Sequence, residues 1–162
     1  MDNHWGVELL TRVFMGFGAR QLHRVVSIAE ANALLAKLQI DLIVSEAVID
    51  GEDVYEFVRN VRLSSEREPN RFVPVILLSA HTAAQKVAQA RDAGINFFVA
   101  KPISPKVIMD RVLWVANGKR QCLETDTYAG PDRRFRDDPL PPGLAGRRRT
   151  DAKTIEPEEN TA

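Results

Sequence analysis

The sequence is poor in the residues that build covalent or metal centres. It contains one cysteine, Cys122, among 162 residues, which excludes an internal disulfide. The three histidines have no spacing that suggests a metal-binding or catalytic cluster. No glycine-rich phosphate loop and no G-x-S-x-G nucleophile motif is present. We therefore expect a protein that is not an enzyme.

Long apolar runs and a basic leader are also absent. No stretch approaches the roughly 18 apolar residues of a membrane span, and residues 2–4 do not resemble the basic start of a signal peptide. The 22 Lys and Arg residues balance the 22 Asp and Glu residues, so the chain has no overall excess of one charge. We expect a cytoplasmic protein that does not bind membranes, and we do not expect nucleic acid as its main partner.

Three short apolar runs each deliver a polar side chain at their C-terminal end. The runs are Asp41–Glu46, Val73–Leu78 and Asn96–Ala100, and the side chains that they deliver are Glu46, Ser79 and Lys101. Short runs rich in β-branched residues are typical of strands that are buried on both faces. Because ligands bind at the carboxyl ends of strands in open α/β sheets, we expect the carboxylate, the hydroxyl and the ammonium group to meet at one edge.

Strands and helices are expected to alternate from the N-terminus to Gly118. The expected strands are the three runs above and Arg24–Ile28; the expected helices are Asn3–Phe17, Ala29–Leu38, Asp53–Ser64, Thr82–Ala93 and a helix from Ser104-Pro105 to Gly118. Ser104 is the expected N-cap of the last helix, and Gly94 the expected end of the fourth. Such alternation predicts a parallel sheet with right-handed crossovers.

At this point the chain resembles the response-regulator receiver (CheY-like) family, from about Asp2 to Gly118. The resemblance rests on four segments, which are Asp2-Asn3, Asp41–Asp53 (DLIVSEAVIDGED), Pro74–Ala80 (PVILLSA) and Ala93–Ser104 (AGINFFVAKPIS). It implies a flavodoxin-like α/β fold, in which helices flank a doubly wound parallel sheet. It also implies a domain over residues 1–118 that works in two-component or phosphorelay signalling.

The resemblance assigns roles to particular residues. The family's phospho-accepting aspartate stands where this chain has Glu46, a Ser or Thr stands at Ser79, and an invariant lysine stands at Lys101. An aromatic switch residue falls at Phe98. An acidic pair near the first helix binds Mg²⁺ in the family, which would here use Asp2 together with Glu46.

Glutamate at the acceptor position changes the expected chemistry. Its extra methylene moves the carboxylate about one bond length into a pocket sized for aspartate, so in-line attack on a phospho-donor is disfavoured. We expect Glu46 to pair with Lys101 and to accept a hydrogen bond from Ser79. Two interpretations stay open, a constitutive partial mimic of the phosphorylated state and a residue that only fills the pocket. A third possibility is conventional phosphorylation of Asp50 or Asp53.

The beginning of the chain departs from the family pattern. Receivers begin with a central strand that ends in the acidic pair, but only Met1 precedes Asp2. A strand needs about 3 to 10 residues, and we expect that roughly ten further residues, including this strand, precede Asp2 in the native protein. The alternative is a four-stranded domain in which the second and third strands pair directly.

Residues 119–162 differ in composition from the rest. They hold five of the nine prolines and almost no apolar periodicity, so we expect a flexible tail. Six arginines fall between Pro131 and Arg149. Arginine-rich extensions of this kind resemble those of CheY-like proteins that bind cyclic di-GMP, with Arg133, Arg134 and Arg136 gripping the phosphates. The alternative is a solvated segment whose basic and acidic halves neutralise each other.

The fourth and fifth helices suggest an interaction surface. The fifth carries Val107, Ile108, Met109, Leu113 and Trp114, more apolar positions than one buried stripe needs. We expect a histidine kinase or a downstream target to bind there, or a second copy of the chain to form a homodimer. The preferred function is a stand-alone, degenerate receiver that acts by protein contact without phosphorylation, and the alternative is a cyclic di-GMP effector.

Overall fold

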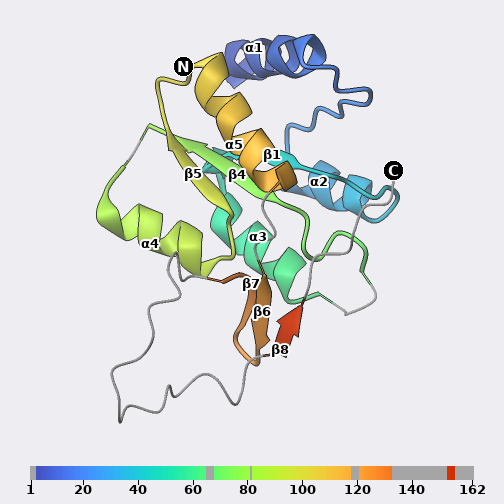
Figure 1. The fold of residues 1–162 in the computed structure, drawn as a ribbon, viewed down its shortest axis with the longest axis vertical. Helices are drawn as coiled ribbons and strands as arrows, with labels where there is room; N and C mark the ends of the chain where they lie inside the picture. The colour runs from blue at the N-terminus through green and yellow to red at the C-terminus, as the bar shows by residue number, and fades with distance from the viewer. Residues whose placement is uncertain (1–2, 65–67, 81, 118–120, 133–152, 156–162) are drawn as a thin grey trace.

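The structure is a computed structural model that describes residues 3–64, 68–80, 82–117, 121–132 and 153–155 (Figure 1). Its centre is a parallel sheet of three strands in the order β1-β4-β5, namely β1 (Ile43–Glu46), β4 (Val75–Ser79) and β5 (Phe97–Ala100). Glu46 pairs with Leu78 and Ser79 pairs with Ala100, so the three strands end close to one another. The three predicted strands that deliver polar side chains are therefore confirmed.

Five helices cover the two faces of this sheet (Figure 1). They are α1 (Asn3–Gly16), α2 (Ile28–Leu35), α3 (Val54–Arg62), α4 (Ala84–Asp92) and α5 (Pro105–Asn117). All five were predicted within a few residues of these bounds, although the predicted end of α5 at Gly118 lies outside the described residues. Within the described ranges, no helix is both long and apolar enough to cross a bilayer.

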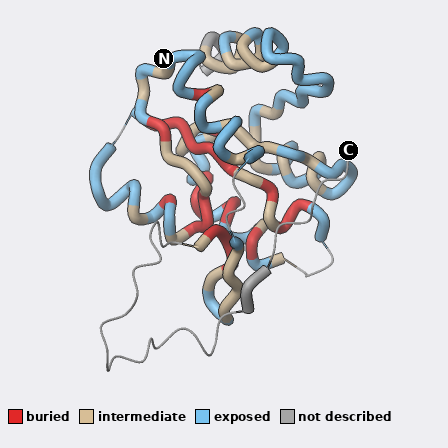
Figure 2. The backbone as a smooth tube through the Cα atoms, viewed as in Figure 1, coloured by how far each residue is buried: buried red, intermediate tan, exposed pale blue. Residues whose placement is uncertain are grey.

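The core lies on both sides of the central strand β4, as the buried parts of Figure 2 show. Val75 and Leu77 point to a cluster with α2, α3 and α4, whereas Ile76 and Leu78 point to a second cluster with Ile108 of α5 and residues of α1. All four side chains are at most 2 % exposed. A strand that is apolar on both faces reads as a continuous hydrophobic run, which explains why the sequence signal was strong here.

Polar side chains fix where the helices begin. Ser27 accepts a hydrogen bond from the Glu30 amide at the start of α2, and Asp53 accepts one from the Tyr55 amide at the start of α3. Ser104 accepts one from the Val107 amide, so its predicted role as N-cap of α5 is confirmed. These caps satisfy amide groups that a helix leaves without partners in its first turn.

A short hairpin that was not predicted separates β1 from α3. Its strands are β2 (Val48–Ile49) and β3 (Glu52–Asp53), joined by Asp50 and Gly51. Both turn residues have positive φ, 49° at Asp50 and 79° at Gly51. A two-residue hairpin needs this left-handed backbone, and Asp-Gly is among the sequences that adopt it most readily.

The predicted strand Arg24–Ile28 is wrong. Residues 21–27 form no strand, and Ile28 already begins α2. Strand β1 is the edge of the three-stranded sheet, and among the described residues no strand precedes it in the chain. Arg24–Ile28 pairs with none of the described strands, β1 included, and so lacks the inter-strand hydrogen bonds that a strand needs. The alternative four-stranded arrangement, in which this segment would pair with β1, is therefore wrong as well.

The expectation of no regular structure beyond residue 119 is wrong for part of that segment. Strands β6 (Cys122–Thr125) and β7 (Tyr128–Pro131) form an antiparallel hairpin, and β8 (Lys153–Ile155) pairs with the other side of β6. Residues 129–131 of β7 are buried. These strands are only three or four residues long, and β7 includes a glycine and a proline, which hid them from a search for apolar periodicity. The boundary of the domain at Gly118 stays a prediction.

Candidate functional site

The carboxyl edge of the parallel sheet gathers the predicted polar side chains. Glu46 is the last residue of β1, Ser79 is the last of β4, and Lys101 follows β5 directly. The Lys101 amide donates a hydrogen bond of 2.8 Å to the Ser79 carbonyl, which extends the ladder between β4 and β5 by one residue. The register of the sheet therefore places these three positions side by side, as expected for parallel strands.

An ion pair joins the two charged members of this edge. The Lys101 Nζ donates to the Glu46 Oε1 over 2.5 Å. The side chains are 29 % exposed for Glu46 and 33 % for Lys101, so solvent reaches both members of the pair. The predicted contact between Glu46 and Lys101 is thus present. What this contact does for function stays a prediction.

Helix α1 closes over the same carboxylate through a glycine that the sequence analysis did not single out. A Cβ built on Gly6 would lie 3.7 Å from the Glu46 Oε1, so the first turns of α1 pass directly beside the ion pair. The only signal for this position was a glycine inside an otherwise regular helix, where glycine is disfavoured by about 1 kcal/mol. The site therefore draws on α1 as well as on the three strand ends.

Ser79 and Phe98 occupy different depths of the site. Ser79 is 5 % exposed, and the predicted hydrogen bond from its hydroxyl to Glu46 stays a prediction. Phe98 is half-buried on β5 and packs against the core cluster shared by α2, α3 and α4. It therefore faces away from α5, whereas its neighbour Phe97 faces towards it. The switch role proposed for Phe98 stays a prediction.

The predicted magnesium site stays untested. Mg²⁺ binds through carboxylates and waters in near-octahedral geometry, but the carboxylate here, Glu46, is engaged by Lys101. Among the described residues, no three His, Cys, Asp or Glu side chains lie close enough together to hold a metal ion. Asp2 lies outside the described residues, so the predicted use of Asp2 with Glu46 stays untested.

A second surface lies over α5 and β5. The rings of Phe97 and Trp114 meet edge to face with centroids 4.7 Å apart, and the Arg111 guanidinium lies 5.4 Å from the Phe97 centroid. Trp114 remains 39 % exposed, and Val107 and Leu113 of the same helix are exposed as well. An exposed apolar group beside an arginine is typical of interaction surfaces.

The remaining predicted ligand residues lie outside the described part of the chain. They are Arg133, Arg134 and Arg136. The interpretation of the chain as a cyclic di-GMP effector depends on these three residues. Both ends of the segment that contains them are placed, because β7 ends at Pro131 and β8 begins at Lys153. The binding of cyclic di-GMP stays a prediction.

Comparison with known proteins gives one consistent result. The family model described as "Response regulator receiver domain" matches residues 2–113. The transcriptional regulatory protein AfsQ1 of Streptomyces coelicolor is 28 % identical over 113 residues, which are 67 % of this chain and 48 % of AfsQ1. The chemotaxis protein CheY-3 of Vibrio cholerae is 22 % identical over 51 % of this chain and 61 % of its own length. The chain therefore spans about half the length of AfsQ1.

Solved structures agree with the sequence relatives. The signal receiver domain of a signal transduction histidine kinase from Syntrophus aciditrophicus superposes with a TM-score of 0.62 and 26 % identity, covering 72 % of this chain and 86 % of that domain. The chemotaxis response regulator CheY4 of Vibrio cholerae gives a TM-score of 0.59 at 21 % identity, over 67 % of this chain and 87 % of CheY4. The predicted flavodoxin-like α/β fold is confirmed.

Proposed function

Because the chain belongs to the response regulator receiver family, we propose that it works in two-component signalling as a protein-interaction module that is not switched by its own phosphorylation. The observation that carries this proposal is the 2.5 Å ion pair between Glu46 and Lys101 at the carboxyl edge of the sheet. Glutamate occupies the end of β1, where the family places its acceptor aspartate, and the lysine already neutralises it.

The geometry disfavours phosphoryl transfer in two ways. First, the Glu46 Oε1 accepts a hydrogen bond from the Lys101 ammonium, so one of the two carboxylate oxygens is already engaged. Second, α1 passes beside the same oxygen, since a Cβ built on Gly6 would lie 3.7 Å from it. Attack requires an unobstructed, in-line approach to phosphorus, and a displacement of about 1 Å can cost a factor of about 100 in rate.

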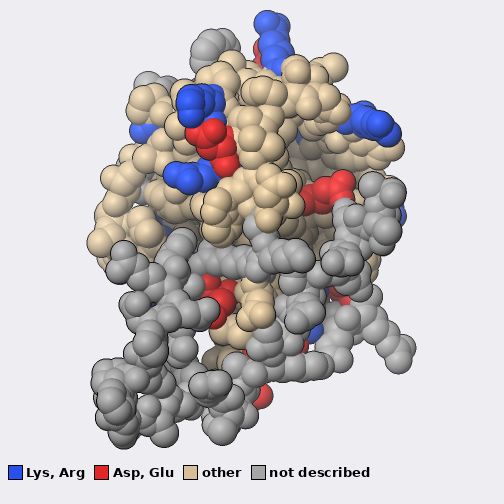
Figure 3. Space-filling model, viewed as in Figure 1, with Lys and Arg blue, Asp and Glu red and all other residues tan. Residues whose placement is uncertain are grey.

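The proposed partners are signalling proteins that dock on the α4–β5–α5 face. Receivers exchange signals with histidine kinases and downstream effectors, and here Trp114, Val107 and Val87 leave apolar surface exposed on that face. In the view of Figure 3, Lys and Arg are interspersed with Asp and Glu among the described residues. Such a mixed surface favours a protein partner, possible self-association included, over nucleic acid.

The test is phosphorylation with a small donor. We expect incubation with acetyl phosphate and Mg²⁺ to leave the intact mass of the chain unchanged, while a conventional receiver treated in parallel gains one phosphoryl group. A Glu46→Asp variant removes the extra methylene and so measures how much that methylene contributes to the resistance to phosphorylation. If the unmodified chain gains a phosphoryl group, the proposal fails, and Asp50→Asn and Asp53→Asn variants then identify the acceptor.

A further inference from the structure

The opposite end of the sheet buries an arginine that holds several loops together. Arg62, the last residue of α3, is 1 % exposed. Its guanidinium donates to the carbonyl oxygens of Gly94, Arg71 and Val73 at 3.1, 2.7 and 2.7 Å, and to Asn96 Oδ1 at 3.3 Å. Burial lowers the pKa of Arg62 to about 10, against the influence of the nearby Cys122 and Tyr128, so the group stays charged at neutral pH.

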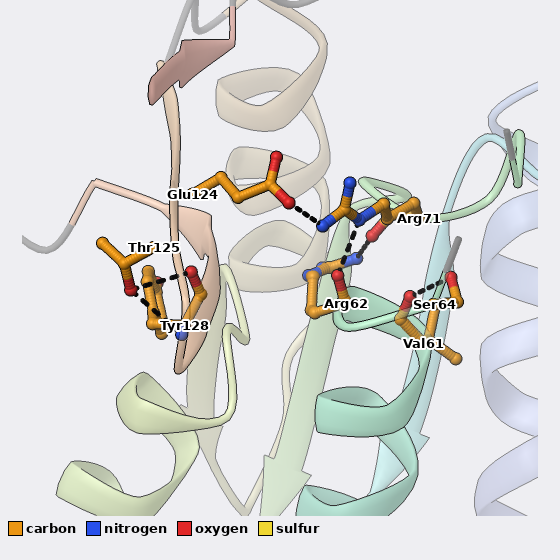
Figure 4. A network of polar contacts seen from close by, with 7 residues as sticks. All are labelled: Val61, Arg62, Ser64, Arg71, Glu124, Thr125 and Tyr128. Atoms are coloured by element: carbon orange, nitrogen blue, oxygen red, sulfur yellow. Dashed lines mark hydrogen bonds and ion pairs between the residues drawn. The ribbon is translucent and has the colours of Figure 1, made fainter. Parts of the chain in front are cut away.

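A second arginine connects this cluster to the C-terminal hairpin. The Arg71 Nε donates to the Arg62 carbonyl over 2.8 Å, and its Nη2 forms an ion pair with Glu124 of β6 (Figure 4). The Arg71 side chain is only 7 % exposed. All four hydrogen bonds of Arg62 go to neutral oxygens, so Glu124 is the carboxylate that the hairpin brings to this buried pair of guanidinium groups.

The hairpin also fits the end of α4 by close contact between two glycines. Gly94 follows α4 with a φ of 86°, and a Cβ there would meet the Ala129 carbonyl oxygen at 2.8 Å. A Cβ on Gly130 would meet the Gly94 Cα at 2.9 Å. Ala129, between these contacts, is 2 % exposed. Only glycine permits the backbone of β7 to approach so closely.

Part of this contact is left unsatisfied. The Glu124 Oε2 is buried, yet within the part of the chain that the structure describes it has no hydrogen-bond partner. A buried carboxylate oxygen without a donor is costly, and the hairpin itself is only two short strands with β8 beside them. Small elements of this kind open at lower free energy than the core of a domain does.

We propose that the β6–β7 hairpin is a strap, a releasable element whose docking on Arg71 and Gly94 holds the ends of α3 and α4. Docked, it supplies the carboxylate for the buried arginines and fixes the loops that Arg62 joins. Released, it frees those helix ends while leaving the ion pair of Glu46 and Lys101 at the carboxyl edge in place.

The test compares backbone hydrogen exchange in the full chain and in two variants. Glu124→Gln removes the charge and keeps the shape, and Gly130→Val adds a Cβ where β7 meets Gly94. We expect at least tenfold faster exchange of hairpin residues 121–132 in both variants. We expect a similar acceleration at residues 60–64 and 93–96, with residues 43–46 of β1 unchanged.

Matched controls separate the strap from general destabilisation. Glu52→Gln removes an exposed carboxylate, and Gly16→Ala adds a Cβ that meets nothing within 4 Å. Neither control should change exchange in the hairpin. Unchanged hairpin exchange in both variants would overturn the proposal, as would a faster hairpin with residues 60–64 and 93–96 unaffected. Equal acceleration of residues 43–46 would also overturn it, because the hairpin would then be an inseparable part of the core.

Discussion

The two ends of the parallel sheet place their charged side chains in opposite surroundings. At the carboxyl end, Glu46 and Lys101 form one ion pair in which each side chain is about one-third exposed. At the amino end, the side chains of Arg62 and Arg71 are almost completely buried and bind backbone carbonyls from three separate segments. Water can solvate the first pair when it opens, whereas a carbonyl of the second network that loses its arginine is left buried without a donor.

This difference indicates that the carboxyl end is a functional site, whereas the amino end is a scaffold that stabilises the fold. A partly exposed pair contributes little to the free energy of folding, so its residues can change with function. A buried network fixes the loops around it, and removal of one member leaves several polar groups without partners. We therefore expect substitutions at the amino end to alter stability and substitutions at the carboxyl end to alter signalling.

The largest expected effect is at Arg62. Arg62→Met would deprive the carbonyls of Gly94, Arg71 and Val73 of a donor. Each buried carbonyl without a partner costs about 1 to 3 kcal/mol, and part of that cost is returned because the charge no longer has to be buried. We expect the free energy of unfolding in urea to fall by about 3 kcal/mol.

A control on the same helix makes this result interpretable. Arg59 is exposed on α3, and Arg59→Met should change the free energy of unfolding by less than about 0.5 kcal/mol. Equal losses in both variants would mean that the amino-end network contributes nothing beyond the helix itself.

A smaller effect is expected at Asn70, which holds α2 to the amino end. Its Oδ1 accepts from the Ile40 amide, and its Nδ2 donates to the carbonyls of Leu35 and Leu38. Asn70→Ala should lower the free energy of unfolding by about 1 to 3 kcal/mol, because these three partly buried backbone groups lose their partner together. Asn60→Ala, on the exposed side of α3, is the matched control. A loss no greater than that of the control would contradict the role of Asn70.

The sequence predicted the layers of the fold and the polar side chains at the carboxyl edge of the sheet because both follow from local signals. A continuous apolar run marks β4, and the residue at the end of each strand marks the edge where Glu46, Ser79 and Lys101 gather. Ser104 marked the start of α5. These features depend on neighbours within a few positions, so they can be read without knowledge of the rest of the chain.

The amino end was missed because its contacts join residues that are distant in the chain. The partners Arg71 and Glu124 are 53 positions apart, and no periodicity connects them. Arg62 did carry a signal, since it follows the buried Val54 and Val58 at four-residue steps and so lies on the inner face of α3. The strand predicted at Arg24–Ile28 failed for a related reason, because local β propensity forms no strand without a neighbour.

The smallest effect on stability is expected at the carboxyl end of the sheet. Lys101→Met breaks the ion pair with Glu46 and should lower the free energy of unfolding by less than about 1 kcal/mol, because solvent and salt already screen a pair with this exposure. A double-mutant cycle with Glu46→Gln isolates the coupling between the two side chains, and it should shrink further at high ionic strength. A coupling free energy as large as the loss of stability in Arg62→Met would show that the Glu46–Lys101 pair belongs to the scaffold, and that its charges are kept for folding rather than for signalling.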